Sequence, residues 1–279
     1  MRCLFCKQDS SDSKSIEHII PEALGNKTFV LPRGYVCDKC NNYFAREVEK
    51  PFLNQFDMRL LRFEQAIPNK KNKIPSIPGS ILSFPVTVRK DIINGEVVTG
   101  IEMPPELFTN IVSTQKSMTL ILPALLDDTL PPQNSIISRF LAKVALEALA
   151  ARLKDNDGWL DYLIDDHQLD AIRNHARIGQ PKEWPCNIRR IYSANADWQI
   201  GGENSQIIYE CDFLLPNIVE SVSGEDNYIQ TEIYFIVALW GIEFTINLGG
   251  PEIDGYEQWL FNHNDISPLH YGKNTSNWG

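Results

Sequence analysis

Two Cys-x-x-Cys pairs near the start of the chain constrain its fold more than any other feature. The first pair is Cys3 and Cys6, and the second is Cys37 and Cys40. Four thiolates at this spacing are the usual ligands of a tetrahedral structural zinc ion, and a redox-active pair is the main alternative. A bound zinc would clamp two distant segments into a small module that has little apolar core of its own.

Composition indicates a folded protein that is not embedded in a membrane. Hydrophobic residues make up 43% of the 279 residues and aromatic residues 10%, which is enough for a sizeable core. No apolar stretch approaches the roughly 20 residues that span a bilayer. Because Cys3 and Cys6 lie so close to the start, we expect no cleaved signal peptide. We therefore expect a cytoplasmic protein without membrane contact, where paired cysteines bind metal more often than they form disulfides.

Charge is distributed unevenly along the chain, whose formal net charge is -10. Residues 1–73 hold 13 Lys and Arg against 9 Asp and Glu, so the remainder carries a balance of -14. Attraction to phosphate is short-ranged at physiological salt, and local charge therefore matters more than the total. The asymmetry favours nucleic-acid contact by the N-terminal part and argues against a high-affinity DNA-binding surface elsewhere.

The predicted fold class is α+β, with a small zinc-stapled module before a larger mixed domain. In the module we predict strands over Ser15–Ile20 and Gly34–Cys37, then a helix from Asp38 toward Leu53. The predicted domain boundaries are 1–60 for the module, 61–79 for a polar, proline-broken linker, and 80–279 for the α+β domain.

In the larger domain, the pattern predicts one clear helix over Ser135–Lys154, with a single apolar stripe facing the core. The expected strands are Ile81–Val88, Glu96–Glu102, Met118–Leu122, Ile188–Ser193, Gln206–Leu214 and Gln230–Leu248.

The segment between the cysteine pairs, together with the residue after Cys40, offers the groups that a metal-dependent hydrolase needs. Glu17 supplies a carboxylate, His18 an imidazole and Asn41 an amide oxygen. Carboxylate and amide oxygens suit Mg²⁺, and a neutral histidine near its natural pKa can deprotonate a water molecule. This combination indicates a nuclease.

As a set, these motifs resemble the HNH endonucleases, the ββα-metal nuclease family, in their endonuclease VII-like branch with zinc-binding cysteine pairs and Cys-x-x-Cys-Asn. The resemblance covers about the first 55 residues. It implies that Glu17 and Asn41 bind a catalytic Mg²⁺ or Mn²⁺, that His18 is the general base, and that the four cysteines hold structural Zn²⁺. The chain departs from the family pattern in having Glu17 where Asp is commoner, and Asn26 is the nearest residue to a central Asn.

Two classes of function follow from these observations. The favoured class is a metal-dependent DNA endonuclease with a one-metal mechanism, and the alternative is a zinc-stabilised nucleic-acid-binding or regulatory protein without catalysis. We expect basic side chains of the module to contact phosphates, namely Lys27, Arg33, Lys39 and Arg46. By resemblance, such nucleases are often bacterial anti-phage defence or restriction effectors. The C-terminal domain would then supply regulation, target choice, contacts with partner proteins of a defence system, or homodimer formation.

Overall fold

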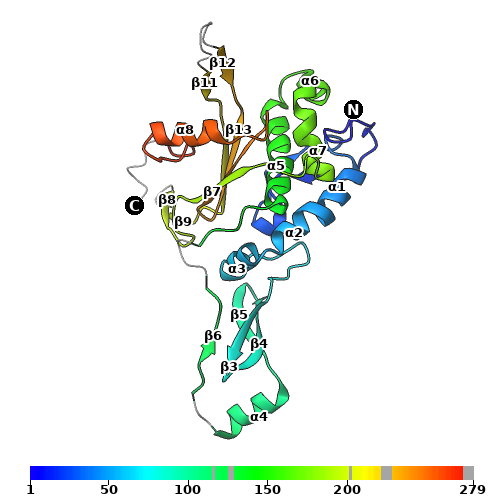
Figure 1. The fold of residues 1–279 in the computed structure, drawn as a ribbon. Helices are drawn as coiled ribbons and strands as arrows, with labels where there is room; N and C mark the ends of the chain where they lie inside the picture. The colour runs from blue at the N-terminus through cyan, green and yellow to red at the C-terminus, as the bar shows by residue number, and fades with distance from the viewer. Residues whose placement is uncertain (115–116, 125–128, 201–202, 221–227, 273–279) are drawn as a thin grey trace. The chain divides into compact units, whose positions relative to one another are not determined.

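The computed structural model describes residues 1–114, 117–124, 129–200, 203–220 and 228–272. It consists of helices and antiparallel sheets, with an N-terminal module followed by a larger α+β region, so the predicted fold class is confirmed (Figure 1). None of the helices within these ranges combines the length and apolarity needed to cross a lipid bilayer.

Two compact units make up the chain. Unit 1 joins residues 1–20 and 27–52 to those from 130 onward, whereas unit 2 contains residues 21–26 and 53–129. These units differ from the predicted division at residues 60 and 80. The physical reason is that a helix beyond residue 130 packs directly against the N-terminal module, so that both lie in the same unit.

In unit 1 the N-terminal module has the expected order of two strands and a helix. Strand β1 (Glu17–His18) pairs antiparallel with β2 (Val30–Leu31). The second strand is therefore not at Gly34–Cys37, where Gly34 instead turns the chain with a φ of 88°. The helical run then begins at Asp38 as predicted, and it comprises α1 (Asp38–Phe44), the π-helical η2 (Ala45–Glu49) and α2 (Lys50–Leu53).

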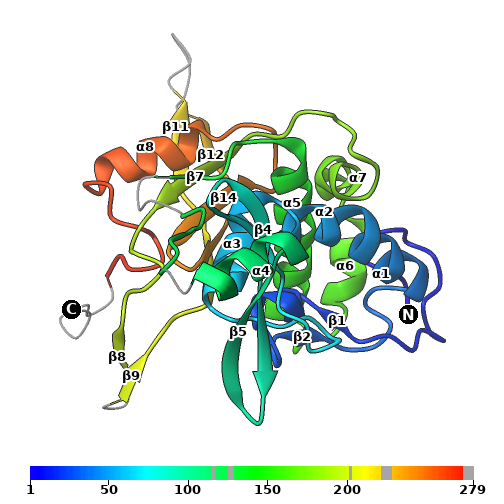
Figure 2. The ribbon, with the colours of Figure 1, turned by 90° about the horizontal axis from the view of Figure 1, so that it is seen from below.

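The long predicted helix is α5 (Ser135–Leu153), and Asn134 caps it by accepting hydrogen bonds from two backbone amides. It packs against η2, β2, α6 (Trp159–Asp165), α7 (Asp170–Ile178) and strand β14 (Ile242–Asn247). Two views show this helix among α1, α6 and α7 (Figures 1 and 2). Because α5 is surrounded, it is buried on nearly all sides and not along a single stripe.

The main sheet of unit 1 is antiparallel, in the order β10-β13-β14-β7. The predicted long strand Gln230–Leu248 is wrong, since it contains a hairpin of β13 (Tyr234–Leu239) and β14 that turns at Trp240 and Gly241. Both strands are buried along their whole length, with α5 on one face and α8 (Asp254–Asn262) on the other (Figure 1). Two covered faces explain why the sequence reads as a continuous apolar run. The other elements of unit 1 are β7 (Cys186–Arg190), β8 (Trp198–Ile200), β9 (Glu203–Ser205), β10 (Tyr209–Leu214), β11 (Asn217–Glu220), β12 (Tyr228–Thr231) and the 3₁₀ helix η3 (His167–Leu169).

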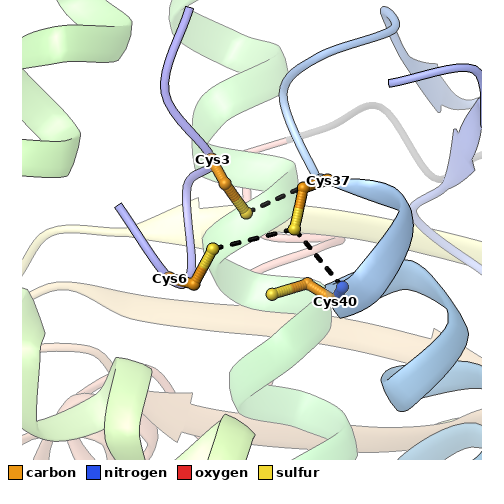
Figure 3. Close-up of side chains that lie close together, drawn as sticks. All are labelled: Cys3, Cys6, Cys37 and Cys40. Atoms are coloured by element: carbon orange, nitrogen blue, oxygen red, sulfur yellow. Dashed lines mark hydrogen bonds between the residues drawn. The ribbon is translucent and has the colours of Figure 1, made fainter. Parts of the chain in front are cut away.

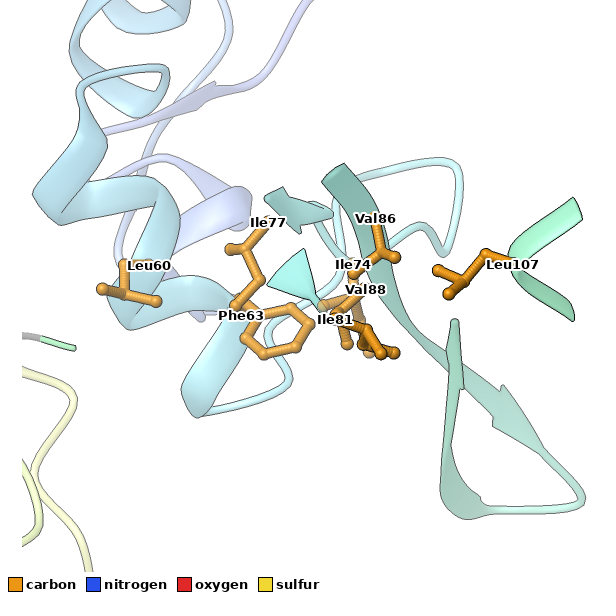
Figure 4. Packing of buried hydrophobic residues seen from close by; sticks show 8 residues of the cluster. All are labelled: Leu60, Phe63, Ile74, Ile77, Ile81, Val86, Val88 and Leu107. Atoms are coloured by element: carbon orange, nitrogen blue, oxygen red, sulfur yellow. The ribbon is translucent and has the colours of Figure 1, made fainter. Parts of the chain in front are cut away.

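Unit 2 has a small core of its own. Two side chains of α3 (Phe56–Glu64), Leu60 and Phe63, pack with aliphatic side chains of a sheet in the order β5-β4-β3-β6 (Figure 4). The predicted linker ends inside a strand, because Ile77 and its neighbours form β3. The predicted strand Ile81–Val88 contains a tight turn at Leu82 and Ser83. The elements of unit 2 besides α3 are the 3₁₀ helix η1 (Glu22–Leu24), β3 (Ile77–Ile81), β4 (Phe84–Ile93), β5 (Glu96–Glu102), α4 (Pro105–Thr114) and β6 (Leu120–Ile121).

Candidate metal centre and nuclease site

The four N-terminal cysteines converge, and we call Cys3, Cys6, Cys37 and Cys40 the cysteine cluster (Figure 3). Their sulfur atoms all lie within 4.8 Å of one another, and those of Cys6 and Cys37 are 3.7 Å apart. A disulfide would need about 2.05 Å, whereas tetrahedral zinc with Zn–S bonds of about 2.3 Å places its sulfurs about 3.8 Å apart. The spacing fits four ligands of one structural zinc.

Local backbone structure places each pair. Cys37 is the N-cap of α1, and its sulfur accepts a hydrogen bond from the Cys40 amide at 3.4 Å. In the first pair, the Cys3 carbonyl accepts a hydrogen bond from the Lys7 amide, and Lys7 adopts a left-handed φ of 60° that closes a tight loop. The Cys3 sulfur accepts from the Cys37 amide at 3.3 Å, which joins the two loops.

Electrostatics in the cysteine cluster favour the thiolate at Cys3, whereas burial raises the pKa of Cys6 and the hydrogen bond with Cys3 raises that of Cys40. A hydrogen bond from Cys40, aided by backbone amides and opposed by burial, lowers the pKa of Cys3 to about 4. The thiolate is the form that binds metal. The donor set and the spacing thus suit zinc, and zinc bound by these residues would fix the start of α1 relative to the N-terminal loop.

Glu17 and His18 lie together on β1, opposite Leu31 and Val30. Successive side chains of a strand point to opposite faces, and the two differ in exposure accordingly: Glu17 is buried and His18 half-buried. Asn41 follows Cys40 in the first turn of α1 and is half-buried. The structure therefore places Glu17 and His18 on β1 and Asn41 on α1, the helix whose start carries two of the four cysteines, and their catalytic roles stay a prediction. Asn26 is fully buried, in unit 2.

The Glu17 carboxylate belongs to a buried group of charges that the sequence did not suggest. The ammonium of Lys143, on α5, lies 2.6 Å from Glu17, 2.8 Å from Glu49 and 2.9 Å from Glu147. The same ammonium donates a hydrogen bond to the His18 carbonyl at 3.2 Å. We call Lys143, Glu17, Glu49 and Glu147 the lysine cluster. The side chains of Lys143 and Glu147 are fully inaccessible, that of Glu17 is 6% exposed and that of Glu49 is 17% exposed.

The lysine cluster carries more negative than positive charge. Burial acts to lower the pKa of Lys143, but attraction to Glu147, Glu17 and Glu49 outweighs it and raises that pKa. Burial raises the pKa of Glu17, partly opposed by Lys143, and raises the pKa of Glu147 far more. The neighbouring carboxylates thus favour the charged form of Lys143, whereas burial disfavours the charged form of Glu147.

One sequence signal could have revealed the lysine cluster. Lys143 and Glu147 are spaced i,i+4 within an otherwise apolar part of α5, between Phe140 and Ala150. Charged residues in such a run are either exposed on one side or paired in the core, and long buried helices require pairing. No pattern, in contrast, pointed from either residue to Glu17 or Glu49.

The basic residues predicted to contact phosphates are all exposed, namely Lys27, Arg33, Lys39 and Arg46. Arg46 forms an ion pair with the adjacent Glu47 at 2.6 Å, and surface pairs of this kind contribute little to stability. These four residues are accessible to a ligand, and their contact with DNA stays a prediction.

Comparison with known proteins identifies one similarity. Residues 3–57 match the family model of an HNH endonuclease. No curated protein and no solved structure showed significant similarity to the chain. The matched stretch contains the cysteine cluster, Glu17, His18 and Asn41, and it ends well before α5. The resemblance predicted from the motifs is confirmed over these residues, and an HNH endonuclease domain at 3–57 supports a nuclease.

Proposed function

We propose that the protein is a metal-dependent DNA endonuclease that hydrolyses phosphodiester bonds by a one-metal mechanism. The observation that carries this proposal is a His on a two-stranded hairpin, between two cysteine pairs that form one four-cysteine cluster, within the stretch that matches HNH endonucleases. A module that only binds nucleic acid has no need for Glu17, His18 and Asn41 together.

In this proposal His18 is the general base. Its ring nitrogen takes a proton from a water molecule, which then attacks the phosphorus atom in line with the leaving oxygen. The residue is half-buried at the end of a short strand, and its Nδ1 atom is inaccessible, so Nε2 is the nitrogen that would take the proton. Its backbone is fixed by pairing with Val30 and by the hydrogen bond from Lys143.

Glu17 and Asn41 would hold the catalytic metal ion. Their oxygen atoms suit a hard cation such as Mg²⁺ or Mn²⁺, which when bound would neutralise charge that develops on the phosphate. The cysteines would hold zinc separately, since soft sulfur ligands select a different metal. Exposed Lys27, Arg33, Lys39 and Arg46 would draw the phosphate backbone to this end of the chain.

The wider role that we propose is that of a bacterial anti-phage or restriction effector, in which residues after the nuclease module choose the target or bind partner proteins. One His-containing module cuts one strand at each visit. Cleavage of both strands would therefore require a homodimer or two successive encounters.

A plasmid assay tests the activity. Intact protein incubated with supercoiled DNA and Mg²⁺ or Mn²⁺ should produce nicked circles, and His18→Ala should lower the rate by about 10²–10⁴ because a general base is lost. His167→Ala is a matched control, since the His167 side chain is 92% exposed and its ring bonds to Asp170 within the same surface turn. Zinc content and thermal unfolding should match the parent in both variants.

The assay also separates the alternative function. A protein that shifts DNA in a gel but does not nick it with either metal is a zinc-stabilised nucleic-acid-binding protein, and this result would overturn the endonuclease proposal. If His18→Ala nicks as well as the parent, the catalytic role of His18 is wrong.

A further inference from the structure

Lys143 is a fully buried cation whose partners include the predicted metal ligand. Four acceptors surround its ammonium group: carboxylate oxygens of Glu17, Glu49 and Glu147, and the His18 carbonyl. The three carboxylates lie at ion-pair distance from it, and the His18 carbonyl accepts a hydrogen bond from it. Two of the four acceptors belong to the adjacent residues on which the proposed chemistry depends.

The surroundings leave little freedom to the Lys143 side chain. Helix α5 holds its backbone, and the neighbouring Leu141, Ala142, Val144 and Ala145 are fully buried. Glu147 lies one turn further along the same helix, and Glu49 lies at the end of η2. The ammonium is therefore a fixed point, against which a longer and more flexible carboxylate such as Glu17 can be oriented.

Orientation matters more for Glu than for Asp. Glu17 has one more rotatable bond than the Asp that is commoner at this position of the family, and more rotamers must be excluded before one oxygen can face a cation. The Oε1 atom of Glu17 is held by Lys143 at 2.6 Å. When Lys143 fixes one carboxylate oxygen in this way, the position of the other oxygen is also defined, and it can act as the metal ligand.

We propose that Lys143 is a positioning residue of the nuclease site, which orients the Glu17 carboxylate for the catalytic cation and fixes the His18 backbone. The inference deepens the proposed function and rests on it. Residues that hydrogen-bond a metal ligand typically change metal affinity or activity by about 10- to 100-fold when they are removed. The helix that carries Lys143 lies outside the stretch similar to HNH endonucleases, so residues beyond that stretch complete the site.

The test replaces both partners of a buried pair, because Lys143→Met alone leaves three carboxyl groups without a cation and endangers folding. The variant Lys143→Met with Glu147→Leu removes the i,i+4 pair of α5 and fills the space with apolar atoms. The matched control is Arg152→Met with Asp212→Asn, which removes an exposed ion pair between α5 and β10. Zinc content and thermal unfolding verify that each variant is folded.

The readout is Mn²⁺ binding to the intact protein, followed by the loss of the free Mn²⁺ spectrum in electron paramagnetic resonance. The variant of the lysine cluster should bind Mn²⁺ about 10- to 100-fold more weakly than the parent. The affinity of the control variant should stay within about threefold of that of the parent. In a Glu17→Gln background the cluster replacement should cause no further loss, because Lys143 acts through Glu17.

Three outcomes would overturn the inference, and they separate it from the proposed function. If the parent cuts DNA and the folded cluster variant binds Mn²⁺ and cuts as the parent does, Lys143 is only structural and the endonuclease proposal stands. A further loss in the Glu17→Gln background would show that Lys143 acts by another route. If the parent neither binds Mn²⁺ nor cuts DNA, the proposed function fails, and the positioning role fails with it.

Discussion

The cysteine cluster and the lysine cluster are built in contrasting ways, although both involve the N-terminal module. All four cysteines lie within the first 40 residues, on one loop and on the start of α1. The lysine cluster instead joins β1 and η2 to α5, and Lys143 is 125 residues away from His18 in sequence. One cluster is therefore local in sequence, and the other exists only after the larger part of unit 1 has folded.

This contrast shows that the N-terminal loop and the strand β1 are held in place by separate interactions. Zinc binding can fix the loop and the helix start, because ligand spacing alone defines its geometry. Aromatic packing and buried charges hold the module against α5. The rings of Phe52 and Phe140 are stacked with their centroids 3.8 Å apart, and Lys143 pairs with Glu17 of β1. The module depends on α5 for its core, which explains why it shares a compact unit with residues beyond 130.

The largest expected effect, on zinc content and folding, comes from removing one ligand of the cysteine cluster. Cys40→Ser should reduce zinc from about one ion per chain to a small fraction, since structural zinc sites contribute about 10–16 kcal/mol in small domains. The N-terminal module should unfold, while β13 and β14 stay folded around their own buried residues. Elemental analysis and hydrogen exchange of the two regions measure both effects.

Cys186→Ser is the matched control for the zinc experiment. Cys186 is a buried cysteine on β7 and lies outside the cysteine cluster. Its replacement should leave zinc content unchanged. Zinc retained at the parental level by Cys40→Ser would contradict a four-cysteine site.

A smaller effect should come from breaking the shared core. Phe140 on α5 is fully buried and stacks on Phe52, with an angle of 5° between the two rings. Phe140→Ala should lower the free energy of unfolding by about 3–5 kcal/mol, because a large cavity is left. Amide exchange should accelerate in α1 and η2 as well as in α5 if all of them share one core.

Phe261→Ala provides the comparison for the core experiment, since this side chain is 79% exposed on α8. It should change stability by less than about 0.5 kcal/mol. Faster exchange in α5 together with unchanged exchange in α1 and η2 would mean that the N-terminal module folds independently, and the contrast drawn above would be wrong.

The same contrast explains what could be predicted from the sequence. Spacing alone located the cysteine cluster, the strand with Glu17 and His18, and the start of the helix at Asp38, because each depends on residues close together in the chain. The Asn94-Gly95 turn between β4 and β5 is likewise local, and the expected strand Glu96–Glu102 was placed correctly.

Prediction failed where distant residues decide the outcome. The spacing of Lys143 and Glu147 within an apolar run is a local signal for a buried pair, but no local pattern links them to Glu17 or Glu49, and packing against η2, β2 and α7 buries them. The run Gln230–Leu248 looked like one strand because burial on both faces removes the usual alternation. Turns without Gly at the first position, such as Leu82-Ser83, gave no local signal.

Helix α7 connects the two clusters, and its His175 gives the smallest of the expected effects. Arg173 on α7 donates a hydrogen bond to the carbonyl of Leu4, between two of the cysteines. His175, two residues later, bonds to Ser138 on α5, five residues before Lys143. The position of α5 beside the N-terminal loop therefore depends in part on a titratable ring.

The hydrogen bonds define the protonation state of His175. Its Nδ1 atom lies 2.7 Å from the Pro181 carbonyl, which can only accept, so Nδ1 carries the proton. Nε2 then accepts from the Ser138 hydroxyl at 2.9 Å. Burial lowers the pKa of His175, partly opposed by the Pro181 carbonyl. A second proton would remove the acceptor at Nε2 and place a charge in the core.

Because the pKa of His175 is lower in the folded protein than in the unfolded chain, its contribution to the free energy of unfolding depends on pH. Below about pH 6.5 the unfolded chain binds a proton at His175, whereas the folded protein stays neutral there until the pH reaches its lower pKa. The free energy of unfolding should therefore decrease as the pH falls through this range. His175→Gln should lower the melting temperature at neutral pH but reduce its further decline between about pH 7 and about pH 5.5. The exposed His167→Gln should decline as the parent does. Equal acid dependence in all three proteins would show that α7 holds the two clusters together without help from the neutral ring.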